Sequence, residues 1–388
     1  MSLYSSIDMP IPFTVFYNED IFIRQSSGGI RCYFENLITA IAECGLSSNT
    51  VDLGPHDPSD YILHRPIAEL TLGRNLLALI NIARRCILSA HYRFNAKRVV
   101  YHPTYYRDPF LVWSRAPIVS TIHDMIHELY PHYFSLEYQS RISSYTRSKK
   151  NAIFASKQII AVSNSTKSDI LAAYPGINSD LISVIYHGSC HIRDFLRTAD
   201  AARIATFSFS RDPFFLYVGS RLHYKGFSML VDAFKGFICQ TGAANARLIC
   251  VGAPFTCAEQ ILLNQIGFNN KVQALQVSNS DLAVLYTGCV CLIYPSRYEG
   301  FGLPLIEAMA AGSRVICSDI PSSREIAGDY AMFFPPHEVK SLIQLLISTY
   351  TTQTPSKLRS SLIAYASRFT WKDCASRTLE VYLRSLSL

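Results

Sequence analysis

The sequence predicts an α/β protein built from two doubly wound parallel-sheet domains that face a cleft. Short apolar runs rich in Val, Ile, Phe and Tyr recur along the chain, with helical patterns between them. Strands that are buried on both faces have such continuous apolar runs, and parallel strands need helical crossovers. The chain has 388 residues, of which 49% are hydrophobic, which suits two domains with sizeable cores.

The expected strands divide into two sets of similar size. A polar stretch from His191 to Pro213 separates the sets, so we expect domains at 1–195 and 196–370. Residues 371–388 have the spacing of an amphipathic helix, which we expect to pack back on the first domain. The runs begin at Phe13, Val51, Arg98, Pro117, Gln158 and Ile182 in the first set, and at Phe214, Arg247, Lys271, Cys289, Arg314 and Ala331 in the second.

The charge balance limits the partners that we expect. The formal charge is +7 and the pI about 8.8, and no RNA-recognition, zinc-finger or arginine-rich signature accompanies it. We therefore expect no nucleic acid as partner. An anionic substrate or an anionic membrane surface fits this balance better.

The cysteines and the apolar segments indicate the compartment. There are eleven cysteines and no C-x-x-C pair, which favours free thiols in a reducing environment. The first residues show no basic segment followed by an apolar run, and the apolar run from Leu76 to Ala83 is too short for a membrane span. We expect a cytoplasmic location.

The segment "TIHDMIHELYP" (121–131) holds two histidines with the spacing of one helical turn, as in some zinc sites. His123 directly follows the expected strand 118–122, so we expect it at the cleft. It precedes any helix in this segment, so the spacing of the two histidines need not place them on one helix face. No third residue has metal-ligand spacing, so we expect no metal. We interpret His127 as a polar loop residue with only a local role.

The loop and helix "SRYEGFGLPLIEAMAAG" (296–312) follow a strand of the second domain. Pro304 suits the first position of a helix, and Gly300 and Gly302 allow a backbone to approach a ligand closely. Taken alone, Glu307 is equally well an acid favoured by the helix dipole, and Glu299 a solvated loop acid.

The spacing of these two acids, with the Gly-Phe-Gly turn and the Pro-initiated helix between them, resembles the E-x7-E element of a known family. This family comprises the retaining glycosyltransferases of family 4, which have the two-domain GT-B fold. The resemblance implies that Glu299 contacts the transferred sugar and Glu307 the ribose of a nucleotide. The backbone of Gly300, Phe301, Gly302 and Leu303 would then meet the sugar and the diphosphate.

Two further segments of the second domain resemble the same family. The segment "FFLYVGSRLHYKGF" contains Gly219, Arg221 and Lys225; its two cations could be a solvated helix face, but the resemblance assigns both to the diphosphate. Fixed cations stabilise a nucleoside diphosphate leaving group without a metal. In "NKVQALQVSNSDLAVLYTGC" the backbone at Gln276 and Val277 would contact the base.

In the first domain, "QSSGGIRCYFENLI" is by itself a plain strand–helix turn. The resemblance implies that Gly28 and Gly29 close on the diphosphate or the reacting sugar. It also places His123 near the transferred sugar and the attacking hydroxyl. Asp124 would orient His123 or bind the acceptor. Further along, Ser163, Asn164 or Ser165 is expected to cap a helix, with Thr166 and Asp169 as a capping-box variant.

With this resemblance, we expect a retaining, metal-independent glycosyltransferase without a cofactor. It would move a mannose- or rhamnose-like hexose from a GDP- or UDP-linked donor to a glycan or lipid-linked acceptor in surface polysaccharide synthesis. A sugar-nucleotide epimerase of the same fold and a catalytically dead sugar-nucleotide-binding protein are the alternatives. The basic segments 73–98 and 141–150 are interpreted as surface helices, or as a patch that contacts an anionic membrane.

Overall fold

The structure, a computed structural model, describes residues 13–18, 20–25, 28–44, 51–52, 99–106, 116–189, 192, 195–196, 207 and 212–387. The basic segment 73–98 lies outside the described residues, as does most of the expected linker 191–213. No helix within the described ranges has the length and apolar character needed to cross a membrane.

The first domain is a parallel sheet in two connected parts. One part has the strand order β2-β1-β3 and the other β4-β5-β6, and a parallel bridge between Tyr101 and Ile118 joins them. The strands are β1 (Thr14–Tyr17), β2 (Val51–Asp52), β3 (Val99–His102), β4 (Val119–Ile122), β5 (Gln158–Ala161) and β6 (Ile182–Val184).

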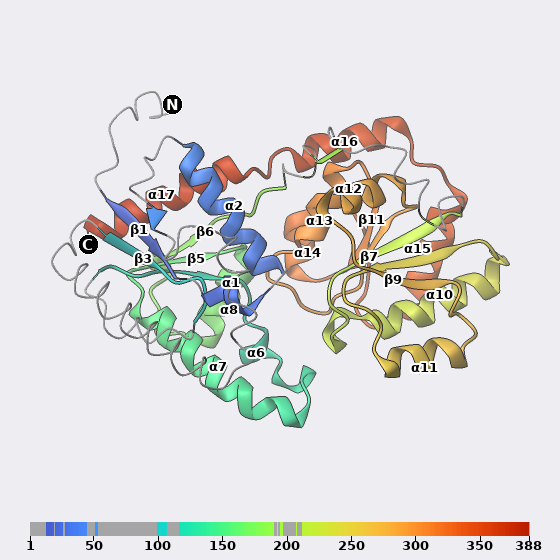
Figure 1. Cartoon of the computed structure of the whole chain (residues 1–388), viewed down its shortest axis with the longest axis horizontal. Coiled ribbons are helices and arrows are strands. Elements are labelled where there is room, and N and C mark those ends of the chain that lie inside the picture. Colours follow the sequence, from blue (N-terminus) through green and yellow to red (C-terminus); the bar gives the residue numbers. More distant parts are fainter. Residues whose placement is uncertain are drawn as a thin grey trace, which may run out of the picture.

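Helices and 3-10 turns of the first domain connect these strands and cover the sheet (Figure 1). Helix α8 begins directly after β5, because the Ser163 hydroxyl accepts a hydrogen bond from the Thr166 N–H and caps the first turn. The described elements are α1 (Asp20–Arg24), α2 (Gly29–Glu43), α6 (Ile126–Leu129), η4 (Pro131–Tyr133), α7 (Leu136–Ala155), α8 (Asn164–Ala173) and η5 (Ser179–Leu181).

The second domain has one six-stranded parallel sheet with the order β12-β11-β10-β7-β8-β9. Each expected apolar run contains one strand, and all the pairings are parallel, so the predicted α/β class is confirmed. The strands are β7 (Phe214–Val218), β8 (Arg247–Val251), β9 (Val272–Leu275), β10 (Leu292–Tyr294), β11 (Val315–Ser318) and β12 (Met332–Phe334).

Helices lie on both faces of this sheet, each over its own apolar cluster. The cluster under α10 and α15 includes Phe234 and Leu346, and the cluster under α12, α13 and α16 includes Leu305 and Leu362. The described elements are η7 (His223–Lys225), α10 (Phe227–Thr241), α11 (Cys257–Gln265), α12 (Asn279–Gly288), α13 (Leu303–Ala310), α14 (Pro321–Ala327), η8 (Gly328–Tyr330), α15 (Val339–Thr351) and α16 (Ser356–Ala366).

The last helix, α17 (Trp371–Ser387), leaves the second domain and lies beside α2 and β1 of the first (Figure 1). Its Trp371, Val381 and Tyr382 are buried in the core of the first domain. The Tyr382 hydroxyl lies 2.7 Å from the Tyr17 hydroxyl and 2.6 Å from Nδ1 of His102. This buried polar network fixes α17 on the first sheet.

Candidate active site

Glu299 lies on the loop between β10 and α13, and Lys225 ends the 3-10 turn η7 that follows β7. The Lys225 Nζ donates to both carboxylate oxygens of Glu299, at 2.6 and 2.8 Å. Gly226 follows with φ 71°, and a Cβ there would lie 2.2 Å from the Pro295 carbonyl oxygen. The glycine thus lets η7 approach the loop that carries Glu299.

Arg221 lies on the loop between β7 and η7 and is held by its own domain. Its Nε lies 2.7 Å from a carboxylate oxygen of Glu259, its Nη2 donates to the Pro254 carbonyl, and its guanidinium lies over the ring of Phe255. Burial raises the pKa of Glu259, but the hydrogen bond from Arg221 and those from Thr256 outweigh it and leave this pKa below its usual value. Arg221 is therefore a fixed cation with an acidic partner.

The role of Glu259 as the partner of Arg221 was not predicted from the sequence. The signal that could have found it is the Thr256-x-x-Glu259 spacing, which forms a capping box at the start of α11. Gly219 lies beside this region with φ 135°, and a Cβ on Gly252 would lie 2.7 Å from the Gly219 carbonyl oxygen. The ends of β7 and β8 are thus in close backbone contact next to Arg221.

Helix α13 begins at Leu303, with Pro304 in its first turn and Gly302 before it at φ 101°. No side chain caps its first turn, where Pro304 has no N–H and the Leu305 N–H donates to the Gly302 carbonyl at 3.0 Å. An anion here would meet the positive end of the helix and the N–H groups that remain. Glu307 lies one turn further on, is only 8% exposed, and accepts a hydrogen bond of 2.9 Å from the Tyr286 hydroxyl.

The other expected residues of the second domain differ in exposure. The Phe301 side chain is buried and stacks on the His187 ring at 4.4 Å, so only its backbone can meet a ligand. Gln276 and Val277 lie between β9 and α12; Gln276 is exposed, and Val277 packs partly on the sheet.

Gly28 and Gly29 lie at the start of α2. Arg31, two residues later, donates to the carbonyls of Phe22 and Gln25 and thus ties the start of α2 to the segment before it. Burial is the main cause that raises the pKa of Cys32 to about 12, and the charge of Glu307 adds to it.

His123 directly follows β4. Its ring packs edge-on to Tyr33 at 5.0 Å, and its Nε2 is buried with no hydrogen-bond partner among the described residues. Burial lowers the pKa of His123 to about 4, against the opposing charge of Asp124. The imidazole is thus neutral near pH 7 and keeps one ring nitrogen available for a ligand.

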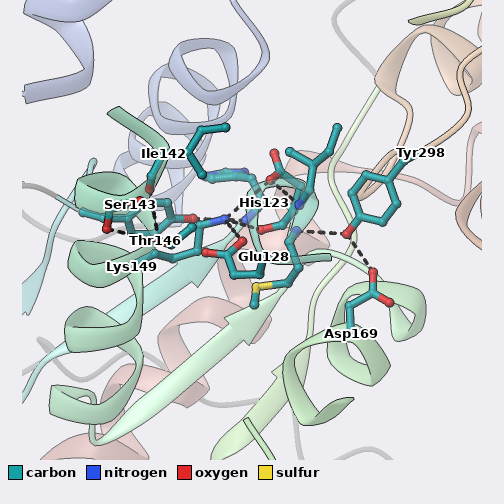
Figure 2. Close-up of polar contacts among 12 residues, drawn as sticks. His123, Glu128, Ile142, Ser143, Thr146, Lys149, Asp169 and Tyr298 are labelled. Atoms are coloured by element: carbon teal, nitrogen blue, oxygen red, sulfur yellow. Dashed lines mark hydrogen bonds and ion pairs between the residues drawn. The ribbon is translucent and has the colours of Figure 1, made fainter. Parts of the chain in front are cut away.

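Below His123, a buried lysine holds the loop that carries Asp124 (Figure 2). The Lys149 Nζ donates to the Asp124 carbonyl and to Glu128, both at 2.9 Å, and lies 3.6 Å from the Asp124 carboxylate. Burial opposes ionisation of Asp124, but Lys149 and His127 outweigh it, so the pKa of Asp124 lies below its usual value. The expectation that all cations of 141–150 lie on the surface is wrong for Lys149, whose side chain is 0% exposed.

His127 lies in the short helix α6, whereas His123 precedes that helix, so the spacing between them does not place them on one helix face. The His127 ring stacks on Phe134 at 4.7 Å and contacts Tyr145 at 4.5 Å. Among the described residues, no three His, Cys, Asp or Glu side chains gather as metal ligands.

The two domains meet on both sides of Glu299. The Tyr298 hydroxyl accepts from the Met125 N–H at 2.9 Å and donates to Asp169 at 2.7 Å (Figure 2). The Gly300 carbonyl accepts from the hydroxyls of Ser163 and Thr166, at 2.6 and 3.1 Å.

These contacts correct one expectation from the sequence. Ser163 caps α8, as one of the alternatives predicted, but Asp169 is not part of a capping box. Its carboxylate instead accepts the hydrogen bond from Tyr298 of the second domain. Glu325 on α14 also contacts α8, since it accepts from the N–H groups of Asn164 and Ser165.

Comparison with known families covers both domains. Residues 27–189 match the family described as "Glycosyltransferase Family 4", and residues 199–369 match "Glycosyl transferases group 1". The chain belongs to glycosyltransferase family 4. The predicted GT-B fold of this family-4 chain is also confirmed by solved structures: a sucrose-phosphate synthase from Thermosynechococcus elongatus matches with a TM-score of 0.70 at 20% identity, over 96% of this chain and 98% of its own.

Other solved structures also share the fold. WaaG, titled a glycosyltransferase involved in lipopolysaccharide biosynthesis, matches with a TM-score of 0.63 at 16% identity, over 95% of this chain and 99% of its own.

Curated relatives of this family-4 chain include the O-antigen chain mannosyltransferase RfbU of Salmonella typhimurium, which is 29% identical over 57% of each chain. The O-antigen chain mannosyltransferase B of Escherichia coli is 33% identical over 27% of this chain and 28% of its own. A GDP-mannose:cellobiosyl-diphosphopolyprenol alpha-mannosyltransferase of Xanthomonas oryzae is 29% identical over 37% of this chain and 40% of its own. The matches thus span between about a quarter and three fifths of these relatives' lengths.

Proposed function

We propose that this family-4 chain is a retaining, metal-independent mannosyltransferase that uses a nucleotide diphosphate sugar. Its acceptor is a glycan or a lipid-linked glycan of a surface polysaccharide. The observation that carries the proposal is the Lys225–Glu299 pair beside the uncapped start of α13, with the neutral ring of His123 on the facing domain. The names of the relatives support mannose as the sugar and GDP-mannose as the donor.

In the proposed mechanism, the diphosphate binds at the start of α13, where the positive end of the helix and the N–H groups without a helix partner attract its oxygens. Lys225 and Arg221 stabilise the charge that develops on the leaving diphosphate. Gly219 and the 300–303 backbone allow the diphosphate to approach closely. Glu307 accepts hydrogen bonds from the ribose hydroxyls. The backbone at Gln276 and Val277 lies beside the base.

On the sugar side, Glu299 and His123 orient the transferred hexose, and Gly28 and Gly29 close over it at the start of α2. The acceptor hydroxyl attacks the anomeric carbon from the face that the diphosphate leaves, so retention requires no carboxylate nucleophile. Its proton passes to an oxygen of the leaving phosphate. Asp124, adjacent to His123, orients the acceptor.

The test is a donor panel of GDP-mannose, UDP-glucose and dTDP-rhamnose, with nucleoside diphosphate release and product stereochemistry as readouts. We expect release from GDP-mannose in the presence of EDTA, an α-linked product, and loss of both with Glu299→Ala. Activity that disappears with EDTA, or that survives in a Glu299→Ala, Lys225→Ala double variant, would contradict the mechanism.

The proposal includes a cytoplasmic location and contact with an anionic membrane through α7. Arg141, Arg147 and Lys150 on this helix are exposed, whereas Lys149 is not part of the face. Sedimentation with vesicles that contain phosphatidylglycerol tests the contact. Binding that falls with added salt supports it, and the absence of salt-sensitive binding refutes it.

A further inference from the structure

The two residues that flank Glu299 are both bound by the opposite domain. Tyr298, on one side, meets the Met125 N–H and the Asp169 carboxylate of the first domain. Gly300, on the other side, gives its carbonyl to two hydroxyls at the start of α8. Glu299 itself is held from within the second domain by Lys225. The first domain therefore holds one neighbour of Glu299 by its side chain and the other by its carbonyl, and none of its described residues makes a hydrogen bond or ion pair with Glu299 itself.

Tyr298 also reaches the loop that carries His123. Met125, whose N–H donates to the Tyr298 hydroxyl, is two residues from His123. Figure 2 shows the Tyr298 hydroxyl between this loop and Asp169 of α8. A single hydroxyl thus connects the Glu299 loop, the His123 loop and α8.

We infer that Tyr298 is a positioning residue, which sets Glu299 against His123 only when the two domains are closed, with Asp169 as its partner. This inference rests on the glycosyltransferase function proposed above, and it gives Tyr298 and Asp169 a role that the sequence did not indicate. A hydroxyl that both accepts from a backbone N–H and donates to a carboxylate fixes direction as well as distance. Burial is the main cause that raises the pKa of Asp169, partly offset by the hydrogen bond from Tyr298.

The chain offers a matched control. The Tyr186 hydroxyl also crosses between the domains, where it donates to Glu325 at 2.8 Å, but it touches neither the 298–300 segment nor the His123 loop. Tyr298→Phe and Tyr186→Phe each remove one hydroxyl from the interface and keep the ring. A general loosening of the interface would affect both variants alike.

The experiment compares steady-state kinetics with GDP-mannose for the wild type and these two variants. We expect Tyr298→Phe to lower kcat by at least about tenfold with a KM for GDP-mannose within about twofold, since the lost hydrogen bond is to a charged group. Tyr186→Phe is expected to keep kcat within about threefold. Asp169→Ala added to Tyr298→Phe should cost little more, because both changes break one connection.

A second readout requires no substrate. Hydrogen exchange of the peptide that carries Met125, followed by mass spectrometry, should be faster in Tyr298→Phe than in the wild type or in Tyr186→Phe. Unchanged exchange overturns the connection, and an unchanged kcat overturns the positioning role. If the wild type transfers no sugar but its exchange responds as expected, the proposed function fails while the connection stands.

Discussion

Gly300 and His123 lie in backbone contact across the domain interface: a Cβ on Gly300 would lie 1.7 Å from the His123 carbonyl oxygen. Two loops that are expected to hold the same sugar therefore touch through a residue without a side chain. The contact requires glycine for its size, because φ at Gly300 is not in the left-handed region.

Gly300→Ala is expected to push the domains apart while each domain stays folded. A displacement of about 1 Å between reacting groups can lower turnover by about 100-fold. We therefore expect kcat/KM of Gly300→Ala to fall by about this factor. Gly176→Ala is the control, since a Cβ there would have no heavy atom within 4 Å. Full activity of Gly300→Ala would show that the closed arrangement is not the active one.

Lys225→Ala is expected to lower kcat/KM by at least about 100-fold, as the loss of one preorganised charge at a leaving group does. The substitution also removes the ammonium group that holds the Glu299 carboxylate, which adds to the loss of activity. Nucleoside diphosphate release measures the effect. Lys235→Ala, an exposed lysine on α10, should retain wild-type rates, and equal losses in both variants would refute the assignment.

Lys149→Met is expected to destabilise the protein by about 3 kcal/mol, because it leaves the buried Glu128 carboxylate without its cation. Urea unfolding followed by circular dichroism measures the free energy of unfolding. The exposed neighbour Lys150→Met should change it by less than about 0.5 kcal/mol. Adding Glu128→Gln to Lys149→Met should recover part of the loss; if it recovers none, the ion pair is not the cause.

Acid should destabilise the protein through buried neutral histidines. Burial lowers the pKa of His102 from 6.5 to about 3, so between these values the unfolded chain binds a proton that the folded chain does not. The stability that the neutral His102 contributes is therefore fully present above about pH 6.5 and is lost as the pH falls toward about 3. We expect His102→Gln to reduce the slope of the unfolding free energy by on the order of 1 kcal/mol per pH unit.

The control for this titration is the exposed His132→Gln, which should leave the slope of the wild type unchanged. Thermal or urea unfolding at several pH values between 4 and 7 measures the slopes. Equal slopes in His102→Gln and the wild type would mean that His102 is not the group that titrates.

The strands could be predicted because parallel strands buried on both faces leave a strong local pattern. The run from Gln158, for example, contains β5, in which every residue is buried. The acid pair Glu299 and Glu307 could be singled out for a similar reason, since a strand, a glycine turn and a helix start lie in sequence around it.

The partners of these residues could not be predicted, because they are distant in the sequence. Lys149 reads as one cation of a basic run, yet its carboxylate partner Glu128 lies in another helix, and the sequence gives no sign of the burial of both. Asp169 has the spacing of a capping residue, and only the approach of the second domain explains its bond to Tyr298. Charge spacing along the chain does not report which groups lose contact with water.

Helix α17 has a consequence for the order in which the chain can fold. The core of the first domain includes Trp371, Val381 and Tyr382 of this helix. The buried Nδ1 of His102 forms a hydrogen bond with the Tyr382 hydroxyl. We therefore expect the first domain to keep an exposed apolar face during synthesis until the second domain and α17 have emerged from the ribosome. The second domain, whose strands and covering helices lie between 214 and 366, can complete its core first, although it is made later.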